Sequence, residues 1–596
     1  MHCDSVVFGI CFVKQAAAAS AFQPSLFAFP QFMSALALLA VVYTVTDIRY
    51  RFRVLVSPFP LFELTLPLLV VIGLATLLTD VWLREGWLVP NISFLTAARW
   101  EALSAALFLA LAMMWIFYGY VRPPRFGKLN GFRYAHTLYR IILKGSESEL
   151  PVIADELGRS AKRLIMLSTL DPPRYARPQP GESSGWRAWL ERRLARRMTA
   201  GRCAHDILLM IGNRKFCRYM VSSAPGTAIE FFKYAAKRRM HGLPLGQFAK
   251  NICAEAIVNK DSNLYHEDEG YESGYFGYVK PFSEALFGSF ELVESLGERF
   301  GSPLDVGYAS TRRWDADQVG VYTRAALITI RSYLKERRNL YSHSFALSRA
   351  LHSVGSMCSG IYLLDIAQTD PVAKDTQEKF RIAIEFVGET VKAIEEEAKE
   401  GLEIGSLRVR NREALTQSFL DHLADLAFDL LFKVATIKGG GEDFDFAMWD
   451  LQHNTAWVGI FEHHESGAAR NALAFKVRRL LYDEIRELDT MPHYKPAKIL
   501  GLCLYTMGLT SGPKSNIDRY SRPLHKAVLS WTRRNYLRLV KTSPDVAAAC
   551  LVGSVSFDGA NRRLVKAYAK GLDHEPQRTY LPLDPIAQTD IPADSG

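Results

Sequence analysis

The segment from Gly508 to Ser515 has part of the spacing of a phosphate-binding loop, the motif that holds nucleotide phosphates in many hydrolases. Lys514 and Ser515 stand at the motif's offsets from Gly508, where a lysine would reach the phosphates and a hydroxyl would bind Mg²⁺. Pro513, however, occupies the second required glycine position, and proline has no backbone N–H to donate to a phosphate. We therefore predict no nucleotide hydrolysis at this segment.

Two other clusters contain residue types that bind cations. His463, His464 and Glu465 are consecutive, and neighbouring side chains on a helix point about 100° apart, so the two histidines cannot face one ion as an i, i+4 pair can. The acidic loop from Tyr265 to Glu272 lacks the alternating ligand spacing and the distal glutamate of an EF-hand. We predict no metal at either cluster and interpret the loop as solvated or in contact with protein.

The remaining candidates for chemistry are too scattered to define a site. The eight cysteines form no C-x-x-C pair, which argues against a zinc ribbon or a disulfide framework. Serines and histidines are plentiful. Because the members of a catalytic triad can come from distant positions, the sequence alone does not show which of them would act together, and it nominates no catalytic residue. It predicts no cofactor and favours a protein that is not an enzyme. The alternative is a membrane-tethered enzyme with an unrecognised site among the helices that follow the spans.

The elements that carry these residues begin with a membrane section. A span needs about 20 consecutive, mainly apolar residues. Three stretches meet this length: Leu26 to Thr46, Leu61 to Thr79, and Ala102 to Tyr120. The sequence therefore predicts a membrane all-α fold, with three transmembrane helices within residues 26–121 and a large, mainly α-helical cytosolic region after them. Residues 1–25 are expected to be a tail or a signal-like leader.

Basic residues orient the three predicted spans. The first connection, Asp47 to Pro60, contains three arginines and one acid, and no acid occurs among the basic residues directly after the third span. The second connection, Asp80 to Glu101, has three acids against two arginines. By the positive-inside rule, the N-terminus is outside and the C-terminal region is cytoplasmic. We expect a multi-pass protein of a bacterial inner membrane.

Glu63 is an ionisable residue near the start of the second predicted span. Such a residue is a candidate for function by default. A position about one turn into the helix also allows it to reach the headgroups or to pair with Arg53. We interpret Glu63 in the second way, without an ion pathway.

Beyond residue 121 apolar residues recur at helical spacing almost throughout, and period-2 strands are scarce. Gly439, Gly440 and Gly441 form the sharpest break in this pattern. We therefore predict a basic juxtamembrane helical domain over residues 122–438 and a C-terminal helical domain over residues 442–596.

A tryptophan- and arginine-rich helix is expected from Trp186 to Met198, directly after a Pro-rich linker. Aromatic residues fall largely on one face of it and arginines on the rest, the pattern of a helix that lies in the headgroup plane. An ordinary helix packed on its own domain would have the same pattern. The predicted membrane-surface residues are Trp186, Arg187, Trp189, Arg192, Arg193, Arg196 and Arg197.

The charge distribution also favours contact with a membrane surface. Residues 121–250 contain 25 Lys and Arg against 9 Asp and Glu, a balance of +16, whereas the whole chain has a net charge of +10. Basic residues so close to a span favour anionic lipids of the inner leaflet over nucleic acid. The leading hypothesis is a membrane-anchored helical sensor, scaffold or effector that forms homo-oligomers, with a channel-like or membrane-disrupting effector as one version. A lipid- or partner-binding anchor is a further alternative.

Overall fold

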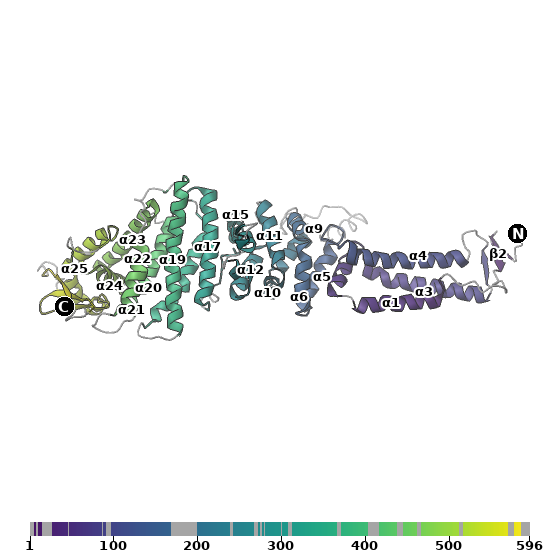
Figure 1. Cartoon of the computed structure of the whole chain (residues 1–596), viewed down its shortest axis with the longest axis horizontal. Helices are drawn as coiled ribbons and strands as arrows, with labels where there is room; N and C mark the ends of the chain where they lie inside the picture. The colour runs from purple at the N-terminus through teal and green to yellow at the C-terminus, as the bar shows by residue number, and fades with distance from the viewer. Residues whose placement is uncertain are drawn as a thin grey trace, which may run out of the picture. The chain divides into compact units, whose positions relative to one another are not determined.

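The computed structural model shows a mostly helical chain, which confirms the predicted helical class (Figure 1). The chain divides into two compact units, Met1–Ala235 and Ala236–Gly596. The described residues are all except 1–4, 8–9, 15–26, 46, 86, 91–96, 169–199, 239–241, 268–271, 274–276, 279, 300, 308–312, 342, 366–370, 403, 405–416, 438–444, 462–466, 512–516, 570–576 and 586–596.

The first unit begins with apolar helices and continues with shorter amphipathic ones. Its elements are β1 (Ser5–Val7), β2 (Ile10–Lys14), α1 (Phe29–Val45), α2 (Ile48–Leu55), α3 (Leu61–Glu85), β3 (Leu88–Pro90), α4 (Ala97–Ile116), the π-helix η1 (Phe117–Val121), α5 (Gly131–Lys144), α6 (Glu149–Gly158), α7 (Ala161–Ser168), α9 (Ala200–Met210), α10 (Arg214–Ser223) and α11 (Pro225–Arg238).

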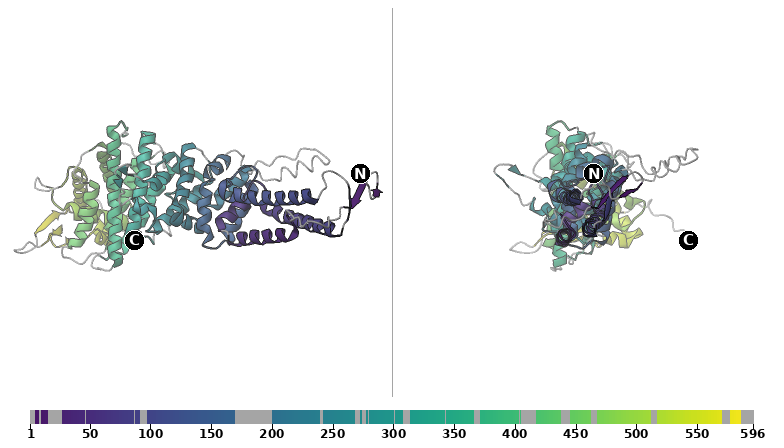
Figure 2. Two further views of the ribbon diagram at one scale, coloured as in Figure 1. Left: turned by 45° about the vertical axis from the view of Figure 1, so that its right-hand side comes forward. Right: turned by 90° about the vertical axis from the view of Figure 1, so that its right-hand side faces the viewer.

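The apolar helices α1, α3 and α4 lie side by side, with α3 packed against both of the others (Figures 1 and 2). A three-stranded antiparallel sheet of order β1-β2-β3 joins residues near the N-terminus to the connection between α3 and α4. Helix α2 lies within the connection that was expected to be a loop, and it packs against α5, α6 and η1.

The second unit has long, mutually packed helices. Its elements are α12 (Gly246–Val258), α13 (Asn263–His266), β4 (Glu272–Ser273), β5 (Gly277–Tyr278), α14 (Pro281–Phe287), α15 (Phe290–Arg299), α17 (Ala316–Arg337), α18 (Phe345–Met357), η2 (Ser359–Leu363), α19 (Pro371–Lys399), α20 (Phe419–Ala435), α21 (Phe446–Trp449), the π-helix η4 (Asp450–Trp457), α22 (Val458–Phe461), α23 (Ala468–Arg486), η5 (Glu487–Asp489), α24 (Tyr494–Met507), α25 (Arg522–Thr542), α26 (Pro544–Ala549), β6 (Val555–Asp558), β7 (Arg563–Ala567) and β8 (Arg578–Pro582).

The core of the second unit forms where α17 lies along α19 and where α20 packs against α23 and α24 (Figure 1). Carboxylates fix several helix starts within this core. Glu294 accepts hydrogen bonds from the Ser344 hydroxyl and from the backbone N–H groups of Phe345 and Ala346 at the start of α18. These groups have no partner within the helix itself, so the carboxylate stabilises its N-terminus.

Candidate membrane-spanning helices and their junction

Two helices of the described chain are long and apolar enough to cross a membrane. They cover Leu61–Trp82, with a mean hydropathy of 2.3, and Ala98–Val121, with a mean hydropathy of 1.9. The first expected span does not reach that standard, because α1 has only 17 residues and its apolar part is Phe29–Val41. At 1.5 Å per residue such a helix is about 26 Å long, slightly short of a hydrocarbon core of about 30 Å. The prediction of three spans is therefore supported for two of them.

Helices α3 and α4 expose apolar side chains on their outer faces. Only 28% of the most apolar window of α3 and 17% of that of α4 is buried inside the structure. Leu66 is 72% exposed and Leu109 is 62% exposed. A helix in the core of a water-soluble domain would bury such residues, because exposed apolar area is unfavourable in water. The two helices therefore have the surface of helices surrounded by an apolar medium.

Close packing holds α1 against α3 and α4. A Cβ atom on Gly73 of α3 would lie 2.8 Å from Cε1 of Phe32, so the missing side chain creates the room for this ring. The rings of Phe32 and Phe108 meet edge to face, with their centroids 6.2 Å apart. Nε1 of Trp115 donates a hydrogen bond to Oγ1 of Thr65 at 3.0 Å, which connects α4 to α3. Small residues and hydrogen bonds of this kind hold helices together where no hydrophobic effect drives their association.

Arg53 of α2 joins the end of α4 to the helices that follow it. Its Nη1 donates to the Gly119 carbonyl oxygen at 2.8 Å, while Nε and Nη2 donate to the two carboxylate oxygens of Glu156 in α6, at 3.0 and 2.5 Å. Arg53 and Glu156 are 6% and 5% exposed. The bond to Glu156 raises the pKa of the arginine further, so the guanidinium stays charged. A bidentate pair also fixes the relative direction of the two helices.

The π-helix at the end of α4 forms part of this junction. The backbone N–H of Arg122 donates to the Phe117 carbonyl at 2.7 Å, which is the i to i+5 pattern of a π-helix. The ring of Tyr120 stacks on the ring of Tyr50 in α2, with centroids 4.1 Å apart. Gly119 is buried at the same place. The last turn of α4 is therefore held by α2 through both a ring contact and the Arg53 guanidinium.

A second set of bonds fixes the start of α5 beside the start of α3. Nδ2 of the buried Asn130 donates to the Val56 carbonyl at 2.6 Å, and Nη2 of Arg133 donates to the Pro58 carbonyl at 2.5 Å. The ring of Tyr134 in α5 also meets the ring of Phe52 in α2 edge to face. Helices α2 and α5 thus form one packed layer at this end of α3 and α4.

The predicted functional residues are placed only in part. Glu63 lies in the first turn of α3 and is exposed, and the guanidinium of Arg53 binds Glu156 and Gly119 instead of this carboxylate. The predicted surface helix, with Trp186, Arg187, Trp189, Arg192, Arg193, Arg196 and Arg197, lies outside the described residues. So do the histidine cluster at 463–465 and the residues 512–516 of the phosphate-loop pattern.

Two features of the chain were missed by the sequence reasoning. Glu156 stands 103 residues from Arg53, and no local pattern links the two. The run from Gly181 to Gly185 fits the G-x-S-x-G pattern of a nucleophile elbow. It stands in the Pro- and Gly-rich linker and lies outside the described residues.

The acidic loop has a structural role at its start. The buried carboxylate of Glu267 accepts hydrogen bonds from the backbone N–H groups of Phe282 and Ser283 and from the Ser283 hydroxyl, at 2.7 to 2.8 Å. This carboxylate therefore stabilises the start of α14 and is not directed at a solvent cation.

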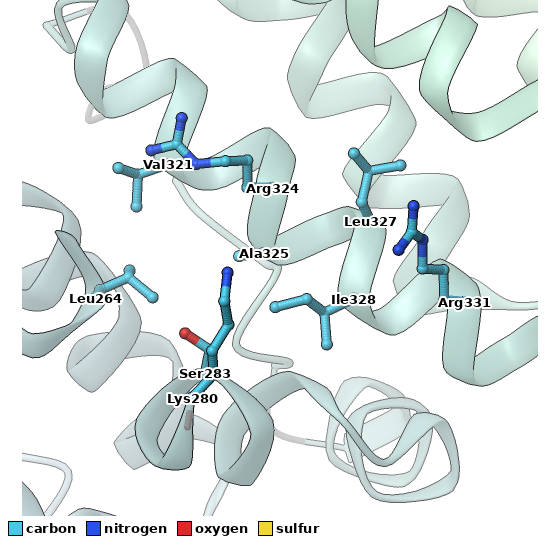
Figure 3. A pocket seen from close by; sticks show the side chains of 9 residues that line it. All are labelled: Leu264, Lys280, Ser283, Val321, Arg324, Ala325, Leu327, Ile328 and Arg331. Carbon is cyan, nitrogen blue, oxygen red and sulfur yellow. The ribbon is translucent and has the colours of Figure 1, made fainter. Parts of the chain in front are cut away.

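A small cavity beside α14 and α17 has a volume of about 190 Å³. Its lining combines the basic residues Lys280, Arg324 and Arg331 with apolar ones such as Leu264 and Ile328, and Lys280 extends between the last two (Figure 3). Its lining includes no carboxylate or histidine that could act as a general base. This cavity gives no support to catalysis.

A larger polar cavity of about 400 Å³ lies between α18 and α20. His352, His422, Asp425 and Asp429 line it, and Asp429 is neutralised by an ion pair with Lys433. Burial and the nearby His343 lower the pKa of His422, so this imidazole is neutral at pH 7. These groups could support the alternative of an enzyme.

One group of possible metal ligands occurs among the described residues. Ligand atoms of Glu484, Glu487 and His493 lie within 4.8 Å of one another. The Lys495 ammonium is 2.9 Å from Glu484, so a cationic side chain already balances this carboxylate. The group is explained by this ion pair without a metal.

No known protein family, curated protein or solved structure matches this chain. A function must therefore be argued from the residues and their geometry.

Proposed function

We propose that the chain is a membrane-anchored helical sensor, scaffold or effector, with α1, α3 and α4 in the bacterial inner membrane. The exposed apolar surface of α3 and α4 supports this proposal, because it suits a hydrocarbon surrounding and not water. The N-terminus is outside and the α2 to α5 junction is at the cytoplasmic face.

The sheet β1-β2-β3 supports this topology. It pairs residues 12–14 with Leu88–Pro90, at the end of α3 and α4 opposite the junction. A topology with the N-terminus outside places both partners of this pairing on the outer side. The basic residues Arg49, Arg51 and Arg53 then fall on the inner side, as the positive-inside rule requires.

The junction at Arg53 is the observation that carries a sensing or coupling role. One guanidinium binds both the last turn of α4 and α6 of the following helices. A shift of α4 would have to move α2 and α6 with it or break the buried hydrogen bond from Arg53 to the Gly119 carbonyl. A hydrogen bond that involves a charged group contributes about 1.5–3 kcal/mol, which favours movement of the two parts together.

Anionic lipids of the inner leaflet are the proposed partner, together with further copies of the chain. The excess of 16 positive charges over residues 121–250 supports the lipid part of this proposal. The helix at 186–198 remains a proposed contact with this surface. Three spans in each copy are few for a transporter with internal repeats, but several copies together could line a pore, which is the channel-like version.

Extraction of the expressed membranes tests the anchoring. We expect the full chain to stay in the pellet after washing with sodium carbonate at high pH and to be released by detergent. Release by carbonate alone would contradict the proposal.

A vesicle-binding experiment tests the helix at 186–198. A synthetic peptide of this segment should bind anionic vesicles, and replacing Arg192, Arg193, Arg196 and Arg197 by Gln should weaken that binding. Unchanged binding would remove this contact from the proposal.

The second candidate function is a membrane-tethered enzyme, and the histidines of the cavity between α18 and α20 favour it. Its test is substitution of His352 and His422 by Gln in a cellular assay of the protein's effect, such as growth or membrane potential under induced expression. Loss of the effect with unchanged protein level and stability would favour chemistry at this cavity. Retention of the effect would favour the non-enzymatic proposal.

A further inference from the structure

Helix α5 carries an apolar face that the described residues leave exposed. Leu129, just before the helix, is 82% exposed, and Phe132, Tyr139 and Leu143 are 64%, 51% and 57% exposed. Spacings of three, seven and four residues place them on one side of the helix. His136 lies on the same side and stacks on Phe132, with the ring planes 9° apart. The opposite side packs inward through Tyr134, Leu138 and Ile142.

Basic residues border this face, and acidic ones are absent from its sequence. Residues 121–145 contain six Lys and Arg and no Asp or Glu. Lys128, Arg140 and Lys144 are exposed at the edges of the apolar face. An amphipathic helix with aromatic and aliphatic residues on one side and basic residues around them is typical of helices that lie in the headgroup plane.

The position of α5 also favours contact with a lipid surface. The bonds from Asn130 to Val56 and from Arg133 to Pro58 place its start next to the start of α3. The exposed rings of Phe59 and Phe62 lie at that start. Helix α5 lies at the end of the apolar helices that the proposed topology places at the cytoplasmic leaflet (Figure 1). Its exposed apolar residues therefore begin near those of α3.

We propose that α5 is an interfacial helix whose face of Leu129, Phe132, Tyr139 and Leu143 enters the headgroup region of anionic lipids. This inference rests on the proposed membrane anchoring. A second copy of the chain fits the same face less well, because its own basic border would bring like charges together. The lipid surface satisfies both the apolar face and the border, since it offers hydrocarbon beside negative charge.

Fluorescence quenching in lipid nanodiscs tests the proposal on the full chain. The six cysteines Cys203, Cys217, Cys253, Cys358, Cys503 and Cys550 are buried, so a background with Cys3 and Cys11 replaced by Ser allows single labels. An environment-sensitive label at Leu143→Cys should be quenched by brominated lipid. A label at Leu74→Cys on the exposed side of α3 should be quenched as well, and one at Ser222→Cys on the exposed side of α10 should not.

The three label positions distinguish the proposed lipid contact of α5 from the proposed membrane anchoring by α3 and α4. Quenching at Leu74 without quenching at Leu143 would overturn the role of α5 and leave the membrane anchoring in place. No quenching at either position would overturn both. Energy transfer between labels at Leu143 on two copies, in place of lipid quenching, would show that a second copy covers the face and would overturn the lipid assignment.

The charge of the lipid supplies a second readout. Quenching at Leu143 should increase when anionic lipid replaces part of the neutral lipid. Substituting Arg140→Gln and Lys144→Gln should abolish that increase. The matched control substitutes Lys233→Gln and Lys237→Gln, two exposed lysines of α11, and should leave it unchanged. An increase that survives the α5 substitutions would overturn the proposed binding of anionic lipid by these residues.

Discussion

Arg53 and Glu156 share two hydrogen bonds in a buried ion pair, and the same guanidinium also binds the Gly119 carbonyl at the end of α4. The pair connects a helix of the predicted first connection with a helix of the region after the spans. Both partners are almost completely buried. Removing Glu156 takes from Arg53 the carboxylate that balances its charge, whereas removing Arg53 leaves Glu156 with the more distant Arg49 and Arg159, at 3.7 and 3.9 Å.

The first prediction concerns this pair. Glu156→Leu should lower the stability of the first unit by about 3–5 kcal/mol, because the buried Arg53 guanidinium loses its carboxylate. Arg53→Met should also lower it, but by less, because Arg49 and Arg159 remain within 4 Å of Glu156. The double variant should recover a large part of that loss, because two apolar side chains leave no buried charge. Thermal unfolding of the purified chain in detergent, with proteolysis of the first unit, measures the effect.

The matched control for the ion pair is Lys215→Gln, whose partner Glu147 forms an exposed pair with it at 3.4 Å. An exposed pair contributes about 0–1 kcal/mol, so this variant should unfold almost like the unmodified chain. Equal losses for Arg53→Met and Lys215→Gln would contradict the role of the junction.

The second prediction concerns the contact between α1 and α3. Gly73→Ala should destabilise the apolar helices by about 1–3 kcal/mol, since the new Cβ would overlap the ring of Phe32. Combining it with Phe32→Leu should restore part of the loss by removing the ring edge. Gly226→Ala is the control, because a Cβ at that position meets no atom within 4 Å. Thermal unfolding in detergent compares the three variants, and equal stability of the two alanine variants would argue against close packing at Gly73.

The third prediction concerns a buried lysine in the C-terminal sheet. Nζ of Lys566 in β7 donates to the Tyr505 carbonyl at 2.5 Å, in the last turn of α24, and lies 4.5 to 5.4 Å from the ring centroids of Trp449, Tyr505 and Tyr568. The helix end and the rings favour a cation there. Burial nevertheless lowers the pKa of Lys566 from its ordinary 10.5 to about 7.

This shift makes stability depend on pH. Above pH 7 the folded chain has released a proton from Lys566 that the unfolded chain still binds up to pH 10.5, so stability should rise between these values. The slope is at most about 1.4 kcal/mol per pH unit for one group. Lys566→Met should lose this rise between pH 7 and 8.5 in thermal unfolding. Identical pH profiles of the two chains would contradict a neutral Lys566. The nearby His453 and His525 have pKa values lowered by burial, so they titrate below this window.

The sequence predicted the helical class and most of the helices, because apolar spacing is a local property. It could not show where a single stretch of apolar helical spacing contains two separate helices. The periodic stretch from Leu150 to Leu167 is divided into α6 and α7 by a turn at Arg159 and Ser160. Both helices bury the same side of the pattern, so the periodicity continues across the turn.

The contacts that make the junction were beyond sequence reasoning. From the sequence, the arginines at 49, 51 and 53 were assigned to a cytoplasmic connection and Arg53 was offered as a partner of Glu63, whereas Arg53 is buried and binds Glu156. The difference depends on a carboxylate 103 residues away, which no spacing rule can connect with it. In the same way, the exposed face of α5 was recognised only as a helical pattern, because exposure depends on which other helices cover it.

The central claim is that α3 and α4 cross the membrane with the junction on the inner side, and cysteine labelling measures this most directly. In the background without Cys3 and Cys11, Glu85→Cys at the end of α3 should react with a membrane-impermeant maleimide in intact spheroplasts. Lys144→Cys at the end of α5 should react only after lysis. Both positions are exposed in the structure, so accessibility within the protein does not limit either reaction. Labelling of Lys144→Cys before lysis, or of Glu85→Cys only after it, would contradict the account.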